Sequence, residues 1–121
     1  MMARPNVRIQ EEGPIKVVCG EPFDVQVFVT AYNPGEVIVC LELPEDLPCS
    51  FVGSNGERRV KQICKTVEAT ADQGKFTVNF KLTIDCDVKD RYTTEITASV
   101  VDSAGEKSRK RSEILRIVAA G

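Results

Sequence analysis

Apolar and polar residues alternate along nearly every segment of this chain, and that period-two pattern limits what it can fold into. In residues 75–86 the apolar positions are Phe76, Val78, Phe80, Leu82, Ile84 and Cys86, and the positions between them are polar. Successive side chains of a β-strand point to opposite faces, so this alternation indicates a strand with one face in a core. Residues 23–31 and 92–100 repeat the pattern, although Phe28 breaks it on the polar side.

Turn signals separate the alternating segments. Asn33-Pro34-Gly35 is one, and the others lie at residues 53–56, 72–74 and 102–105. Proline presets φ and glycine accepts positive φ, so the chain can reverse at these points. The runs between them total seven or eight strands, and none shows a helical stripe. We therefore expect an all-β fold, an immunoglobulin-like β-sandwich of seven to eight mostly antiparallel strands.

The antibody-type subclass of that fold is excluded. It needs a tryptophan and a cysteine pair across the core, but the chain has no Trp, and residues 92–101, in the F-strand position, carry no Cys. Tyr92 stands at the start of that segment, where a tyrosine corner would place it, but the second Cys of that motif is missing and the role is not favoured.

At 121 residues the chain has the size of one domain, and we expect a single sandwich over residues 1–121 with an ordered core at about 7–118. The paired Met1 and Met2 suggest a segment excised from a larger protein. No apolar run predicts membrane insertion. The net charge of −2 offers no overall field for nucleic acid, so we expect no nucleic-acid partner.

Catalysis is not expected, because the chain has no His to serve as a general base. Cys64, between Lys61 and Lys65, is the one cysteine whose neighbours are basic. No zinc spacing or phosphate loop occurs, and no cofactor is predicted. Acidic residues at 85–90, with Asp102 in a later turn, would suit calcium if they met at one end of the sandwich. A solvated corner of Asx turns is the favoured interpretation, since the cations Lys89 and Arg91 lie among or next to these carboxylates.

The basic residues concentrate on the expected final hairpin. They are Lys107, Arg109, Lys110 and Arg111. This group is a candidate contact for an acidic partner. The favoured alternative is that the charges keep an edge strand from aggregating.

Five cysteines leave at least one thiol unpaired within the chain. Cys49 with Cys64 is a candidate disulfide that would brace the Asn55-Gly56 hairpin, whereas Cys19, Cys40 and Cys86 fall at sheet positions. A persistent bridge would indicate an oxidising compartment, and five reduced thiols would indicate the cytosol.

Three stretches resemble the CARDB-like, cell-adhesion-related domains of prokaryotic surface proteins. They are residues 20–33, residues 37–47 with a "Leu-x-Leu-Pro" ending, and residues 92–105 with an "Asp-x-x-Gly" turn. The resemblance spans residues 7–118 and implies an extracellular or cell-surface β-sandwich without catalysis. Five cysteines and a basic final hairpin depart from that family's usual composition.

These observations leave three functions open. The first is a non-catalytic module for structural spacing, adhesion or protein binding within a larger protein. The second is a cytoplasmic module that binds a protein partner by strand addition or through a sheet face. The third is an accessory carbohydrate-binding domain. It ranks last because sugar binding usually needs exposed aromatic side chains, whereas most aromatic residues here occupy the apolar, inward-facing positions of the strands.

Overall fold

The chain folds entirely into strands. The computed structural model describes residues 4–11, 13–53, 59–70 and 74–119, and these form eleven strands without a helix. The strands are β1 (Asn6–Ile9), β2 (Ile15–Val18), β3 (Phe23–Thr30), β4 (Gly35–Glu42), β5 (Cys49–Val52), β6 (Arg59–Val60), β7 (Gln62–Ala69), β8 (Lys75–Leu82), β9 (Ile84–Cys86), β10 (Tyr92–Val101) and β11 (Arg111–Val118). In these residues there is accordingly no apolar helix long enough to span a bilayer.

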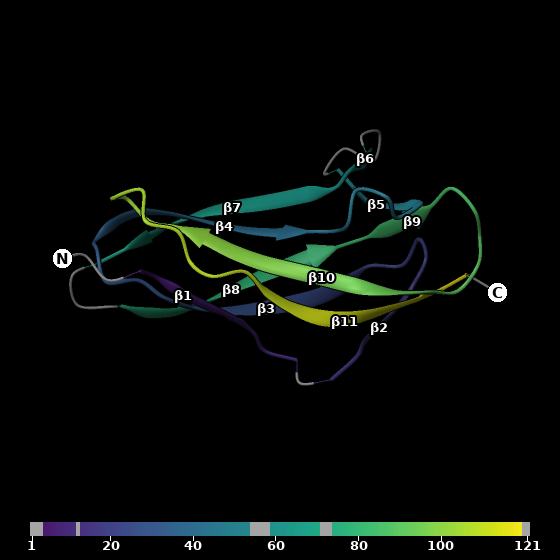
Figure 1. Ribbon diagram of the computed structural model, residues 1–121, viewed down its shortest axis with the longest axis horizontal. Coiled ribbons are helices and arrows are strands. Elements are labelled where there is room, and N and C mark those ends of the chain that lie inside the picture. Colours follow the sequence, from purple (N-terminus) through teal and green to yellow (C-terminus); the bar gives the residue numbers. More distant parts are fainter. Residues whose placement is uncertain (1–3, 12, 54–58, 71–73, 120–121) are drawn as a thin grey trace.

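Two layers make up the molecule. One is a five-stranded sheet in the order β2-β11-β10-β4-β7, in which only β2 pairs in parallel. The other contains the sheets β1-β3-β8 and β6-β5-β9, and β9 continues the line of β8 after Thr83. In Figure 1, β10 and β11 lie in front of β3 and β8. This two-layer, mostly antiparallel arrangement is the immunoglobulin-like sandwich that the alternation predicts.

The strand count exceeds the predicted seven to eight because two continuous runs are interrupted and because Cys49–Val52 forms a strand, β5, that the alternation did not indicate. β8 pairs with β3 up to Leu82, whereas β9 pairs with β5 from Ile84 onward, so the run 75–86 divides where its neighbour changes. Lys61 similarly separates β6 from β7. Alternation in sequence does not report such changes of partner, because the inward face stays apolar across them.

The core lies between the layers, and the alternating positions fill it as predicted. Val78, Phe80 and Leu82 are buried on β8, and the same buried cluster contains Ile96 on β10 and Leu115 on β11 of the other layer. Asp102 is the one buried residue with a charged side chain in the described part of the chain.

The turn at Asn33-Pro34-Gly35 is also confirmed. Gly35 has φ of 119°, and a Cβ atom there would lie 2.8 Å from the Cβ of Ser103. A side chain is thus excluded by both backbone conformation and space. The predicted Asn55-Gly56 turn and the positions 72–73 of the next turn lie outside the described residues.

The predicted Cys49–Cys64 disulfide is wrong. Cys64 bonds Cys40 and Cys49 bonds Cys86, and each pair stands directly opposite in register, β4 against β7 and β5 against β9. Cys49 and Cys64 lie on strands of different sheets, so the hairpin prediction placed them too close. Both bonds join strands within a layer, unlike the antibody-type bridge across the core.

Candidate functional site

A shallow depression lies on the outward face of the sheet β1-β3-β8. Two rows of outward-facing residues line it: Asn6, Thr30 and Lys75 in one, Arg8, Phe28 and Thr77 in the other. The row between them turns its side chains toward the core, so its backbone forms the floor. Arg111, at the start of β11, completes the lining. The cavity measures about 540 Å³.

The lining of this cationic depression carries three positive charges and no acidic residue. The cations are Arg8, Lys75 and Arg111, and all three side chains are exposed. The guanidinium of Arg8 lies 5.0 Å from the ring centroid of Phe28, a cation–π distance. At the margin, the side-chain amide of Asn6 donates to the hydroxyl of Tyr32, which is 54% exposed.

The four basic residues predicted on the final hairpin are exposed, but the structure does not gather them at one site. Lys110 is 2.9 Å from Glu42 in an ion pair. Lys107 forms an isolated antiparallel β-bridge with Val101 through its backbone at the end of the hairpin. Arg111 alone among them lines the cationic depression. A partner role for the whole group stays a prediction.

The second candidate surface is the outer edge of β7. β7 pairs with β4 on one side, and no other described strand pairs with it on the other. The Cα atoms of Cys40 and Cys64 are 4.1 Å apart, which fits the spacing of about 4.5 Å for a non-hydrogen-bonded pair rather than about 5.5 Å. The backbone N–H and C=O of Cys64 therefore point away from β4, and by alternation so do those of Gln62, Thr66 and Glu68.

Lys65 links this edge to the other layer. Its ammonium donates to the backbone carbonyl of Asn79 on β8 and lies 5.4 Å from the ring centroid of Phe80. A Lys that crosses from one edge strand to another covers the side of the sandwich between them. Such a charge also opposes pairing of two copies of the chain.

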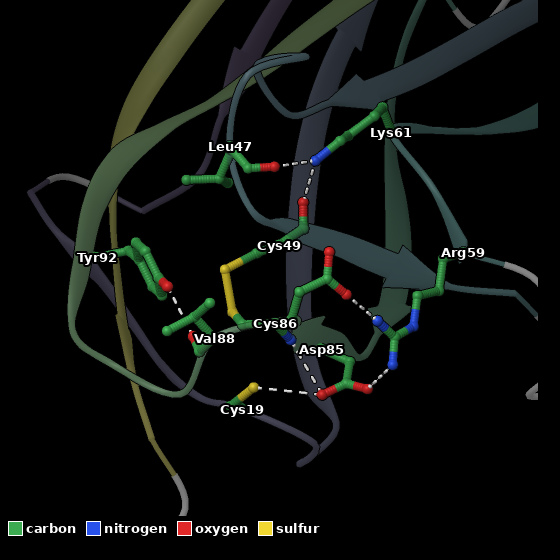
Figure 2. Close-up of polar contacts among 10 residues, drawn as sticks. Cys19, Leu47, Cys49, Arg59, Lys61, Asp85, Cys86, Val88 and Tyr92 are labelled. Carbon is green, nitrogen blue, oxygen red and sulfur yellow. Dashed lines mark hydrogen bonds and ion pairs between the residues drawn. A yellow bond between two sulfur atoms is a disulfide. The ribbon is translucent and has the colours of Figure 1, made fainter.

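Two carboxylates of the acidic corner pair with Arg59. Its guanidinium lies 2.7 Å from Asp85, a contact drawn in Figure 2, and 2.5 Å from Asp87. Asp102 does not join this cluster, because β10 lies between the two turns and carries them to opposite ends of the sandwich. Its carboxylate instead accepts hydrogen bonds from Asn33 and from the backbone N–H groups of Ala104 and Glu106. In the described residues no three His, Cys, Asp or Glu side chains form a metal-binding group.

Cys19 carries the free thiol next to that corner. It is buried, and its Sγ lies 3.6 Å from Oδ1 of Asp85 (Figure 2). Burial raises the pKa of the Cys19 thiol above its ordinary value, and Asp85 raises it further, against a lowering by the backbone of Cys86. The thiol is therefore protonated at neutral pH and is a poor nucleophile.

A neighbouring hydrogen bond supports a tyrosine corner at Tyr92, a role that the missing cysteine of the motif had disfavoured. The hydroxyl of Tyr92 donates to the carbonyl of Val88, four residues upstream, at 2.6 Å. This contact fixes the turn between β9 and β10, as the corner does in immunoglobulin-like domains.

Sequence reasoning missed the cationic depression. Its three strands are distant in the chain, and the row that joins Arg8, Phe28 and Thr77 exists only through sheet pairing. The one local signal was Phe28, an aromatic residue on an otherwise polar strand face.

Known proteins show only distant similarity to this chain. No protein-family model matches the chain, and no curated protein matches it. Among solved structures, a non-cellulosomal cohesin from the hyperthermophilic archaeon Archaeoglobus fulgidus aligns with TM-score 0.46 and 13% identity, covering 96% of this chain and 92% of that one. The ASH / PapD-like domain of human CEP192 aligns with TM-score 0.41 and 12% identity, covering 97% and 85%.

Proposed function

We propose that this chain is a non-catalytic immunoglobulin-like module that binds a protein partner by strand addition at the outer edge of β7. The observation that carries the proposal is the direction of the backbone groups on that strand. Four residues, Gln62, Cys64, Thr66 and Glu68, direct N–H and C=O groups away from β4. A strand laid along this edge would satisfy them, which is how strand addition gives affinity.

Two contacts hold β7 in a fixed conformation, which supports its use as the strand to which a partner strand is added. The Cys40–Cys64 bond fastens the strand to β4 near its middle, and Lys65 holds it to β8. An edge held in its bound conformation loses less entropy when a partner strand arrives.

The chemistry of the described residues supports a role without catalysis. The chain has no His. The free thiol of Cys19 is buried, and its pKa is raised mainly by that burial. Neither feature provides an activated nucleophile.

The setting we propose is an oxidising compartment outside the cytosol. Two disulfides favour an exported module over a cytoplasmic one, because reducing systems keep cytosolic thiols free. The resemblance to CARDB-like domains adds spacing or adhesion within a larger protein to the proposed role. A sugar-binding role is less favoured, since Tyr32 is the one mostly exposed aromatic side chain in the described residues.

Proline at Thr66 tests the edge. The N–H of Thr66 points away from β4, so Thr66→Pro removes one outward donor and leaves the β4 ladder intact. Immobilised wild type and Thr66→Pro would be exposed to the extracellular fraction of the source organism, and bound proteins quantified by mass spectrometry. We expect a partner that the wild type retains and Thr66→Pro loses.

Thr66→Ala is the matched control, because it shortens the same side chain but keeps the N–H. It should retain the partner. If every captured protein binds Thr66→Pro as well as it binds the wild type, strand addition at β7 is wrong. Thermal unfolding of both variants shows whether either has lost its fold.

A further inference from the structure

We propose that the cationic depression binds an acidic segment of a protein partner, with carboxylates on Arg8, Lys75 and Arg111 and an apolar side chain against Phe28. This site lies on the sheet β1-β3-β8 with Arg111 of β11 completing it, whereas the proposed strand addition uses β7, which is separated from β11 by β10 and β4 in the five-stranded sheet. The inference therefore goes beyond the proposed function and does not depend on it.

Charge is the first argument. The chain has more acidic than basic residues, 18 against 16, yet the depression has no acidic lining residue. Within the described part of the chain, Arg59 and Lys110 have ion-pair partners, and the three cations of the depression have none. On the outward face of β3 the next acidic residue is Asp24, four residues from Phe28 or roughly 13 Å along the strand. Asp24 stands opposite Lys81.

Preorganisation is the second argument. The ring of Phe28 holds the guanidinium of Arg8 in place at 5.0 Å, and the planar fork of an Arg fits a carboxylate through two parallel hydrogen bonds. Less side-chain entropy is then lost when the carboxylate binds. The exposed Tyr32 beside Asn6 adds a second aromatic surface, and Tyr and Arg are enriched among residues that dominate protein interfaces.

The volume of the cationic depression and its small number of charges favour a peptide over other anionic ligands. A cavity of about 540 Å³ accommodates a few side chains. Three cations on a chain of net charge −2 neutralise too few phosphates for useful binding to nucleic acid at physiological salt. Phe28 and Phe76 are half-buried, so they do not project as a membrane anchor would.

The test uses isotope-labelled protein and a peptide of four glutamates around a central leucine, followed by two-dimensional NMR. We expect shifts of the backbone amides of Val7, Phe28 and Phe76. The double variant Arg8→Glu with Lys75→Glu should weaken the dissociation constant by at least about tenfold, since both contacts become repulsive. The double variant Lys16→Glu with Arg116→Glu is the matched control, with the same change of net charge on the opposite sheet, and should stay within about twofold.

Four results would overturn the inference. The first is equal weakening in both double variants, which would mean unspecific attraction. The second is equal binding of a peptide with glutamines in place of the glutamates. The third is a set of shifts confined to other residues. The fourth is tighter binding of a heparin hexasaccharide or a DNA duplex than of the peptide at the same residues, which would assign the site to a polyanion. Thermal unfolding checks the fold of each variant, and retained peptide binding by Thr66→Pro would separate this site from β7.

Discussion

The two disulfides join directly opposed residues of neighbouring antiparallel strands, but their surroundings differ. Cys49 and Cys86 are 1% and 5% exposed and belong to the core, whereas Cys64 is exposed on the outward face of the five-stranded sheet. The buried bond fastens β5 to β9, and the exposed bond fastens the edge strand β7 to β4. The same local geometry therefore serves core packing at one place and holds an edge strand in order at the other.

Removing each disulfide should separate these roles. By loop-closure entropy, loss of the bonds with separations of 37 and 24 residues costs about 4 and about 3.5 kcal/mol respectively. Replacing Cys49 and Cys86 by Ala also leaves a cavity in the core, so we expect that variant to be less stable than Cys40→Ala with Cys64→Ala by a further 1 kcal/mol or more, roughly. Urea unfolding of the two double variants measures this difference.

A reversed order of stability would contradict the comparison. It would show that the Cys40–Cys64 bond at the edge strand stabilises the fold more than the buried Cys49–Cys86 bond does. The denaturant slope should be the same in both variants, which checks that neither has changed the extent of unfolding.

Reduction kinetics should also distinguish the two bonds. A phosphine or thiol reductant reaches the exposed Cys40–Cys64 bond in the folded state, while Cys49–Cys86 becomes accessible only on opening of the core. We expect the exposed bond to be reduced at least about tenfold faster, which corresponds to about 1.4 kcal/mol in barrier. Timed alkylation and peptide mapping give the two reduction rates. Equal rates would mean that the region around Cys49–Cys86 opens often enough to expose this bond as readily as Cys40–Cys64.

Sequence alone predicts the inward faces of the strands well, because burial imposes the period of two on every strand. Val78, Phe80 and Leu82 are examples. It does not predict contacts that arise from pairing between distant strands. Cys40 and Cys64 meet because β7 returns along β4, and Arg8 meets Phe28 because β1 pairs with β3. Neither register leaves a local pattern, so both the disulfide partners and the cationic depression were beyond sequence reasoning.

Arg59 should matter less than either disulfide. Its side chain is 48% exposed and bridges Asp85 and Asp87, and exposed ion pairs contribute about 0–1 kcal/mol. Arg59→Gln should therefore lower the free energy of unfolding of the protein by less than about 1 kcal/mol. At high salt the loss should be smaller still. A loss comparable to that of the Cys49–Cys86 bond would show that the charges, and not the sulfur bridge, hold the corner.

Ionisation of the Cys19 thiol should have the smallest effect on stability, and that effect should appear only at alkaline pH. Its pKa is raised in the folded state, mainly by burial, so the folded protein holds this proton more tightly than the unfolded chain does. The resulting stability is complete below the ordinary thiol pKa and is lost as pH rises through the raised value. Wild type should lose stability relative to Cys19→Ala over that range, as thermal unfolding at several pH values would show. A constant difference between them across pH would contradict the raised pKa.

The central claim is an oxidised sandwich in which Cys40–Cys64 fastens the edge strand, Cys49–Cys86 fastens the core, and Cys19 stays free. Intact mass after alkylation in denaturant, with and without prior reduction, followed by peptide mapping, tests it most directly. We expect one alkylated thiol before reduction and five after it, with these two pairs in the map. Five alkylated thiols in both samples, or a Cys49–Cys64 peptide, would contradict the account.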